Sequence, residues 1–108
     1  MAVETDVSAL AAARADGAVV IDVREPEEYE AGHVPGARLI PLRELPARAA
    51  GLPRDRRVHV ICASGSRSAQ AAEWLAMAGW DAVSVAGGTS AWQQAGYPVV
   101  TGARADVA

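Results

Sequence analysis

Short apolar runs alternate along the chain with segments that have the spacing of amphipathic helices. The runs that predict strands are residues 18–23, 38–40, 57–62 and 81–86. The run at 18–23 is apolar almost throughout, which is typical of a strand that is covered on both faces, as in a parallel sheet. The chain therefore has the pattern of a protein with buried strands.

Helical patterns fill the segments between these runs. They cover residues 6–15, 26–31, 42–50, 68–78 and 89–95. The clearest pattern is at 68–78, which Gly79 ends and in which four small or apolar residues share one face. These four residues are Ala71, Ala72, Leu75 and Ala78. Strands that alternate with helices predict an α/β fold with a mainly parallel sheet.

Length and composition indicate one globular domain. The chain has 108 residues, of which 51% are hydrophobic and 21% charged, enough for a single core. We expect this core to span about residues 6–100, followed by a loosely ordered tail at 101–108. No apolar run approaches the ~18 residues of a membrane helix, and the first residues lack the pattern of a secretory signal. Because 13 acidic residues outnumber 10 basic ones, nucleic acid and anionic membranes are not expected partners.

The single cysteine, Cys62, is the most informative residue of the sequence. A lone thiol excludes an internal disulfide and a zinc site of several cysteines, and two isolated histidines make poor ligands, so no metal is expected. Cys62 closes a predicted strand, and ligands of open α/β sheets bind beyond the carboxyl ends of strands. Small residues around Gly65 then lead into a helix, so that backbone N–H groups can converge on an anion. Arg67 adds a full positive charge nearby.

This setting favours ionisation of the thiol. A free cysteine with a pKa of about 8.5 is only about 3% thiolate at pH 7. A helix terminus alone lowers a pKa by at most about 1.5, so the loop and Arg67 must act together. The alternative interpretation is a small buried hydrophobe at a strand end, but a loop of Gly, Ser and Arg is poor packing material. We therefore predict a thiolate nucleophile in a cradle that also binds an anionic substrate.

Three motifs follow one another along the chain with fitting spacing. The first runs from Asp22-Val-Arg24 to the turn Gly32-His33-Val-Pro-Gly-Ala37, and the second is Cys62-Ala-Ser-Gly-Ser-Arg-Ser68. The third joins Gly87-Gly88-Thr-Ser-Ala-Trp92 to Gly96-Tyr97-Pro98. Together they resemble the rhodanese family, in particular its small single-domain sulfurtransferases. The resemblance implies a rhodanese-like α/β fold, with a central sheet of about five strands flanked by helices on both faces.

The resemblance also implies sulfur transfer through a persulfide on Cys62. A donor such as thiosulfate gives its outer sulfur to Cys62, and an acceptor such as cyanide or another thiol removes it. The chain would need no cofactor for this cycle. Its N–H groups would hold the anions, and Arg67 would attract the sulfonate end of the donor. The residues expected to bind substrate are Ala63, Ser64, Gly65, Ser66, Arg67 and Ser68.

Three other residues are expected to support this site structurally. Asp22 and Arg24 would form an ion pair that frames it, and His33 would hydrogen-bond within its turn rather than act as a general base. With no second thiol, the persulfide cannot be resolved internally. The sulfur must therefore leave to an external acceptor, either a small molecule or a sulfur-accepting protein. We expect a cytoplasmic monomer.

Two other functions stay open at this stage. A phosphatase or arsenate reductase could use the same fold, but phosphatases of this fold have five residues between Cys and Arg, where this chain has four. Arsenate reduction lacks a second cysteine to form an internal disulfide. A sulfur-carrier or interaction module would need the same thiol as an enzyme, so the loop does not distinguish the two.

Overall fold

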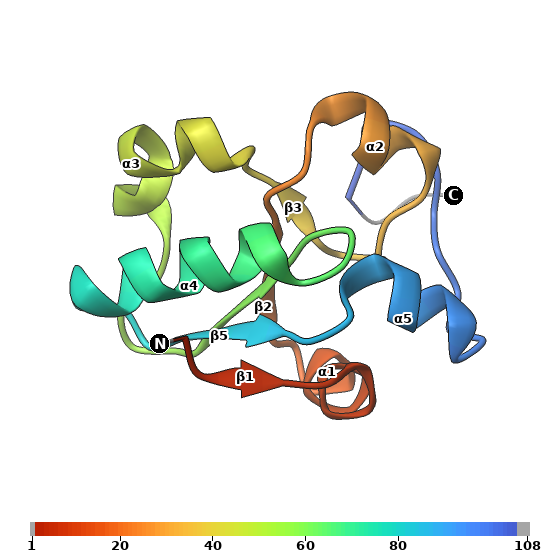
Figure 1. The fold of residues 1–108 in the computed structure, drawn as a ribbon, viewed down its shortest axis with the longest axis horizontal. Helices are drawn as coiled ribbons and strands as arrows, with labels where there is room; N and C mark the ends of the chain where they lie inside the picture. The colour runs from red at the N-terminus through yellow and green to blue at the C-terminus, as the bar shows by residue number, and fades with distance from the viewer. Residues whose placement is uncertain (1, 106–108) are drawn as a thin grey trace.

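A five-stranded parallel sheet forms the centre of the structure, a computed structural model that describes residues 2–105 (Figure 1). The strand order is β1-β5-β4-β2-β3, and every described pairing between these strands is parallel. The strands are β1 (Glu4–Thr5), β2 (Val19–Asp22), β3 (Arg38–Leu39), β4 (Val58–Ile61) and β5 (Ala82–Val85). The predicted α/β architecture with a parallel sheet is confirmed. Strand β1 was not predicted, because two residues carry no apolar alternation.

The described chain has five α-helices, of which the first four connect successive strands and the fifth follows β5. They are α1 (Val7–Ala15), α2 (Pro26–Ala31), α3 (Leu45–Arg48), α4 (Ser66–Met77) and α5 (Gly88–Gln94), with 3-10 turns at Leu42–Glu44 and Ala49–Gly51. The Asp6 carboxylate caps α1 by accepting a 2.8 Å hydrogen bond from the Ala9 N–H, and Pro26 takes the first position of α2. No helix within residues 2–105 has the length and apolar character needed to cross a membrane.

The helices cover both faces of the sheet. On one face, Ala71, Ala72 and Leu75 of α4 pack with Leu45 of α3 on alternate residues of β4. On the other face, the residues of α1 and α5 form a second cluster with Ile61 and Val85. The prediction that Ala78 shares the buried face of α4 is wrong. Helix α4 ends at Met77, so Ala78 lies after the last helical residue, and it is exposed.

The carboxyl ends of β2 and β4 lie side by side. Asp22 pairs in register with Ile61, the residue before Cys62, so the segments that follow both strands leave the sheet at the same edge. Helix α5 reaches this edge as well, since the Thr89 N–H and hydroxyl both donate to the Cys62 carbonyl, at 2.8 and 3.0 Å. The loop after β4 therefore lies between α2 and α5 (Figure 1).

Residues at the carboxyl end of the described chain contact the region around α2. The Gly102 N–H donates to the Glu30 carbonyl at 2.8 Å, and the Gly36 N–H donates to the Ala105 carbonyl at 2.7 Å. The sequence predicted a loosely ordered tail at 101–108, whereas these hydrogen bonds attach Gly102 and Ala105 to the rest of the domain. Residues 106–108 of that prediction lie outside the described residues.

A glycine at the start of α5 allows the closest approach of two backbones at this edge. Gly88 has a φ of +58°, and a Cβ there would lie 2.5 Å from the Cys62 carbonyl oxygen and 2.6 Å from that of Ala63. A side chain at Gly88 would therefore displace the loop that begins at Cys62.

Gly88→Ala is expected to lower the free energy of unfolding by about 2–5 kcal/mol. Left-handed strain of ~1–2 kcal/mol adds to overpacking of ~1–3 kcal/mol. Gly96→Ala is the matched control: it has a φ of +86° and no atom within 4 Å of the added Cβ. This control should lose only ~1–2 kcal/mol. Chemical denaturation measures both values, and equal losses would contradict the close contact at Gly88.

Candidate active site

The thiol of Cys62 lies under the loop that joins β4 to α4. Only 1% of the residue is exposed, and Gly65 closes the loop as the residue before the first turn of α4. Gly65 has a φ of +112°, a conformation that favours glycine, and its N–H donates to the Cys62 Sγ at 3.1 Å. The turn at Gly65 therefore points a backbone donor at the sulfur.

Several donors act on the ionisation of Cys62. Burial raises the pKa of the thiol, because a charged sulfur loses contact with water. The Ser68 hydroxyl and the N–H groups of Ser68, Gly65 and Ser64 outweigh burial and hold the pKa below its ordinary value. In the described chain Ala63 and Ser66, also expected to bind the anion, donate no hydrogen bond to the sulfur. The arrangement can hold a sulfur anion without a metal.

A second hydroxyl lies behind Ser68. The Ser68 Oγ is 3.5 Å from the Cys62 Sγ, 3.1 Å from the Gly65 carbonyl oxygen and 2.8 Å from the Ser84 Oγ. Ser84 belongs to β5, and both serines are fully buried. Sequence reasoning did not identify Ser84. The available signal was a lone hydroxyl within an otherwise apolar strand.

Arg67 already has an anionic partner. Its two terminal nitrogens donate to both carboxylate oxygens of Glu28 in α2, at 2.8 and 2.9 Å, and both side chains are about one-third exposed. The hydrogen bond from Arg67, together with one from the Glu25 N–H, lowers the pKa of Glu28 to about 2. The sequence predicted that the Arg67 guanidinium faces the sulfonate end of a sulfur donor, and it did not predict the ion pair with Glu28. An anionic sulfur donor bound at Arg67 would therefore share its guanidinium with the Glu28 carboxylate.

Asp22 and Arg24 form a buried ion pair at the end of β2. The Arg24 Nη2 is 2.8 Å from one Asp22 carboxylate oxygen and also donates to the Gly32 carbonyl at 2.9 Å. The Asp22 side chain is 0% exposed and that of Arg24 7%. Removing either partner of such a buried pair destabilises the folded protein, because the other charge is left without a partner. The contacts fix the segment between β2 and α2 to the turn after α2.

His33 is held within that turn. Its Nδ1 is 2.8 Å from the Tyr29 carbonyl oxygen and its Nε2 is 2.8 Å from that of Arg104. The ring stacks on Tyr29 with centroids 3.6 Å apart, and the residue is fully buried. These contacts engage both ring nitrogens and suit the structural role expected for His33.

Metal ligands do not gather in the described part of the chain. No group of three His, Cys, Asp or Glu residues within 2–105 lies close enough to hold an ion. His59 lies on β4 with its Nδ1 3.3 Å from the Val19 carbonyl oxygen, and burial lowers its pKa.

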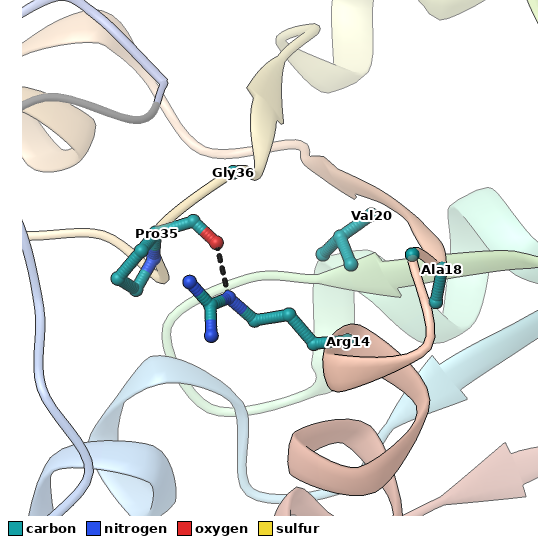
Figure 2. A pocket seen from close by; sticks show the side chains of 6 residues that line it. Arg14, Ala18, Val20, Pro35 and Gly36 are labelled. Carbon is teal, nitrogen blue, oxygen red and sulfur yellow. Dashed lines mark hydrogen bonds between the residues drawn. The ribbon is translucent and has the colours of Figure 1, made fainter.

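A cavity of about 280 Å³ lies between Arg14 and the turn at Pro35 and Gly36 (Figure 2). The Arg14 side chain crosses it, and its Nε donates to the Pro35 carbonyl. The cavity lies where the chain enters β2 and β3, whereas Cys62 follows the carboxyl end of β4. It is therefore separate from the thiol. Its lining consists of Arg14, Gly17, Ala18, Val20, Pro35 and Gly36.

Residues 6–95 match the family model of the rhodanese-like domain. A sulfurtransferase of Allochromatium vinosum is 37% identical over 83 residues, which are 76% of this chain and 78% of that protein. The putative sulfur carrier protein YrkF of Bacillus subtilis is 44% identical over 64 residues, 59% of this chain but 35% of that protein. A solved rhodanese-related protein from Thermoplasma volcanium has a TM-score of 0.85 at 39% identity, with 91% of this chain and 97% of that chain covered.

Glu28→Gln should remove a pH-dependent part of the stability. The pKa of Glu28 falls from 4.5 to about 2 in the folded chain, so its contribution is complete above about pH 4.5 and is lost as the pH falls toward 2. We expect the variant to be less stable than wild type by about 1 kcal/mol at neutral pH, since water screens a pair this exposed. The difference should vanish near pH 2. Denaturation at several pH values measures it.

Glu27→Gln is the matched control for this experiment, because Glu27 lies in the same helix and is exposed. The Glu28→Gln substitution keeps a side-chain oxygen that can accept from the Glu25 N–H, so the start of α2 is retained. A loss of the same size in both variants would show that the ion pair with Arg67 contributes nothing of its own.

Proposed function

The chain belongs to the family of rhodanese-like domains, and from that premise we propose that it is a sulfurtransferase that holds the transferred sulfur on Cys62 as a persulfide. The resemblance inferred from the three sequence motifs is thus confirmed at the level of the family. The observation that carries the proposal is the Cys62 sulfur, nearly buried and yet held toward its ionised form by the Gly65 N–H and the Ser68 hydroxyl.

The reaction consists of two displacements at sulfur. In the first, the Cys62 thiolate attacks the outer sulfur of thiosulfate, the S–S bond of the donor breaks, and its electron pair leaves with sulfite. Cys62 then carries a persulfide with one negative charge. In the second, cyanide or a thiolate attacks the outer sulfur of the persulfide, and the Cys62 thiolate leaves. The cycle is covalent nucleophilic catalysis and consumes no external oxidant or reductant.

The loop serves both anions of this cycle. The N–H groups of Ser64, Gly65 and Ser68 act on a sulfur that is negative as the nucleophile and again as the leaving group. They stabilise developing charge without reorganising, because the turn at Gly65 fixes them beforehand. Arg67 attracts the sulfonate end of the donor while it remains paired with Glu28. Asp22, Arg24 and His33 keep the neighbouring segment in place.

A sulfur-carrier role is the second candidate. The putative sulfur carrier protein of Bacillus subtilis matches this chain at 44% identity. A carrier would form the same persulfide and pass the sulfur to a protein thiol rather than to a small molecule. In either role the lone thiol requires an external acceptor and a reducing compartment, so we assign the protein to the cytoplasm. A monomer suffices for either role, because Cys62 and the donors around it belong to one chain.

Cys62→Ser is expected to lower the rate of sulfur transfer from thiosulfate to cyanide by about three orders of magnitude or more, because a serine hydroxyl cannot form the persulfide. Mass spectrometry of the wild type after thiosulfate treatment should show one added sulfur atom, which cyanide removes. Transfer by the Ser variant at the wild-type rate would overturn the mechanism. A stable persulfide that cyanide does not discharge would favour the carrier. Hydrolysis of a phosphate ester without sulfur transfer would favour a phosphatase.

Glu28→Gln should lower the half-saturating concentration of thiosulfate by about threefold, since an exposed competing carboxylate has been removed. Arg67→Gln should raise that concentration about tenfold, because a hydrogen bond to a charged group is lost. Glu27→Gln again serves as the control and should leave it unchanged. Steady-state kinetics measure all three, and an unchanged value in Arg67→Gln would remove Arg67 from donor binding.

A further inference from the structure

We propose that Ser84 is a positioning residue for Cys62: it donates a hydrogen bond to Ser68 and so turns the Ser68 hydroxyl toward the sulfur when that sulfur is an anion. The inference rests on the proposed function only in taking the Cys62 sulfur as the reacting atom. Neither the three motifs nor the residues expected to bind substrate include Ser84.

The Ser68 hydroxyl has more neighbours than it has protons. The Cys62 Sγ, the Gly65 carbonyl oxygen and the Ser84 Oγ all lie within 3.5 Å of its oxygen. The carbonyl can only accept a hydrogen bond, whereas the two other neighbours can donate or accept. The one Ser68 proton therefore has to be directed, and the charge of the sulfur decides where.

With a neutral thiol, every partner is satisfied in one arrangement. The Cys62 S–H donates to the Ser68 Oγ, the Ser68 O–H donates to the Gly65 carbonyl, and the Ser84 O–H donates to the Ser68 Oγ. The Ser68 oxygen then accepts twice and donates once.

Loss of the thiol proton reverses one bond of this arrangement. The thiolate can only accept, so the Ser68 O–H rotates from the Gly65 carbonyl to the sulfur. The carbonyl is not left unpaired, because the Ala69 N–H still donates to it at 3.1 Å. Ser84 keeps donating to the Ser68 oxygen throughout. A hydroxyl that accepts a hydrogen bond becomes a stronger donor, so Ser84 strengthens the bond from Ser68 to the thiolate.

Burial strengthens the hydrogen bonds that link Ser84, Ser68 and the Cys62 sulfur. Ser68 and Ser84 are both fully buried, and Ser84 lies in β5 in register with Val60 of β4. Because the site is buried, water cannot replace the Ser84 hydroxyl as a donor when an apolar side chain such as Val stands in its place. The relay acts when Cys62 is a thiolate, which is the nucleophile of the first displacement and the leaving group of the second. It thus assists both halves of the cycle through one hydroxyl.

The test compares Ser84→Thr with Ser84→Val, which have nearly the same shape and differ in one hydroxyl. The rate of alkylation of Cys62 by iodoacetamide is followed across pH, together with the ultraviolet absorbance of the thiolate. In Ser84→Val the midpoint should move to higher pH, and the rate on the acid side of the wild-type midpoint should fall about three- to tenfold. Ser84→Thr should stay within about twofold of wild type. Equal profiles for Thr and Val would overturn the proposal.

A double-mutant cycle shows whether Ser84 acts through Ser68. Ser84→Ala should slow alkylation in the wild-type background and have no further effect in a Ser68→Ala background. The same effect in both backgrounds would contradict the relay. Val83→Ala is the control for general damage to β5, since Val83 is buried in the same strand but has no hydroxyl. It should lower the melting temperature without moving the pH profile.

These measurements use no sulfur donor, so the two proposals can fail separately. A wild-type chain that transfers no sulfur, with Ser84→Val still shifted, refutes the sulfurtransferase and supports the relay. Sulfur transfer by wild type with superimposable profiles for Thr and Val refutes the relay and leaves the sulfurtransferase intact.

Discussion

A sulfur anion with almost no contact with water needs hydrogen-bond donors fixed around it, and this requirement organises the site. Burial alone would keep Cys62 protonated. The donors that reverse this effect come mostly from the main chain, and the main chain is fixed by residues elsewhere. Gly65 takes the left-handed turn that aims its N–H at the sulfur, and Thr89 clamps the Cys62 carbonyl from α5. The chemistry of one atom thus depends on segments that meet only in the folded chain.

The parallel pairing of β2 with β4 brings the supporting charges to the same edge. Asp22 and Arg24 fix the segment after β2, and the following helix presents Glu28 to Arg67 in the first turn of α4. Arg67 is thereby held in place by a carboxylate that also offsets its positive charge. This one ion pair thus sets both the position and the net charge of the first turn of α4 beside the loop.

Much of this organisation could be predicted from the sequence. The apolar runs located β2, β4 and β5, and the Gly/Ser/Arg loop after a strand pointed to Cys62. What could not be predicted depends on distance along the chain. Glu28 lies 39 positions from Arg67, and Ser84 lies 16 from Ser68, and no local pattern links either pair. Strand β1 escaped detection for a related reason, since its two residues become a strand only by pairing with β5.

Main-chain recognition of the sulfur also separates ionisation of the thiol from the outer surface of the loop. The side chains of Ser64 and Ser66 are exposed, while the N–H groups that stabilise the thiolate belong to the backbone beneath them. Both positions can therefore be exchanged without removing the backbone donors that lower the pKa of the thiol. The outer surface of the loop, which a molecule approaching the site would meet first, can thus vary while the hydrogen bonds around the sulfur stay in place.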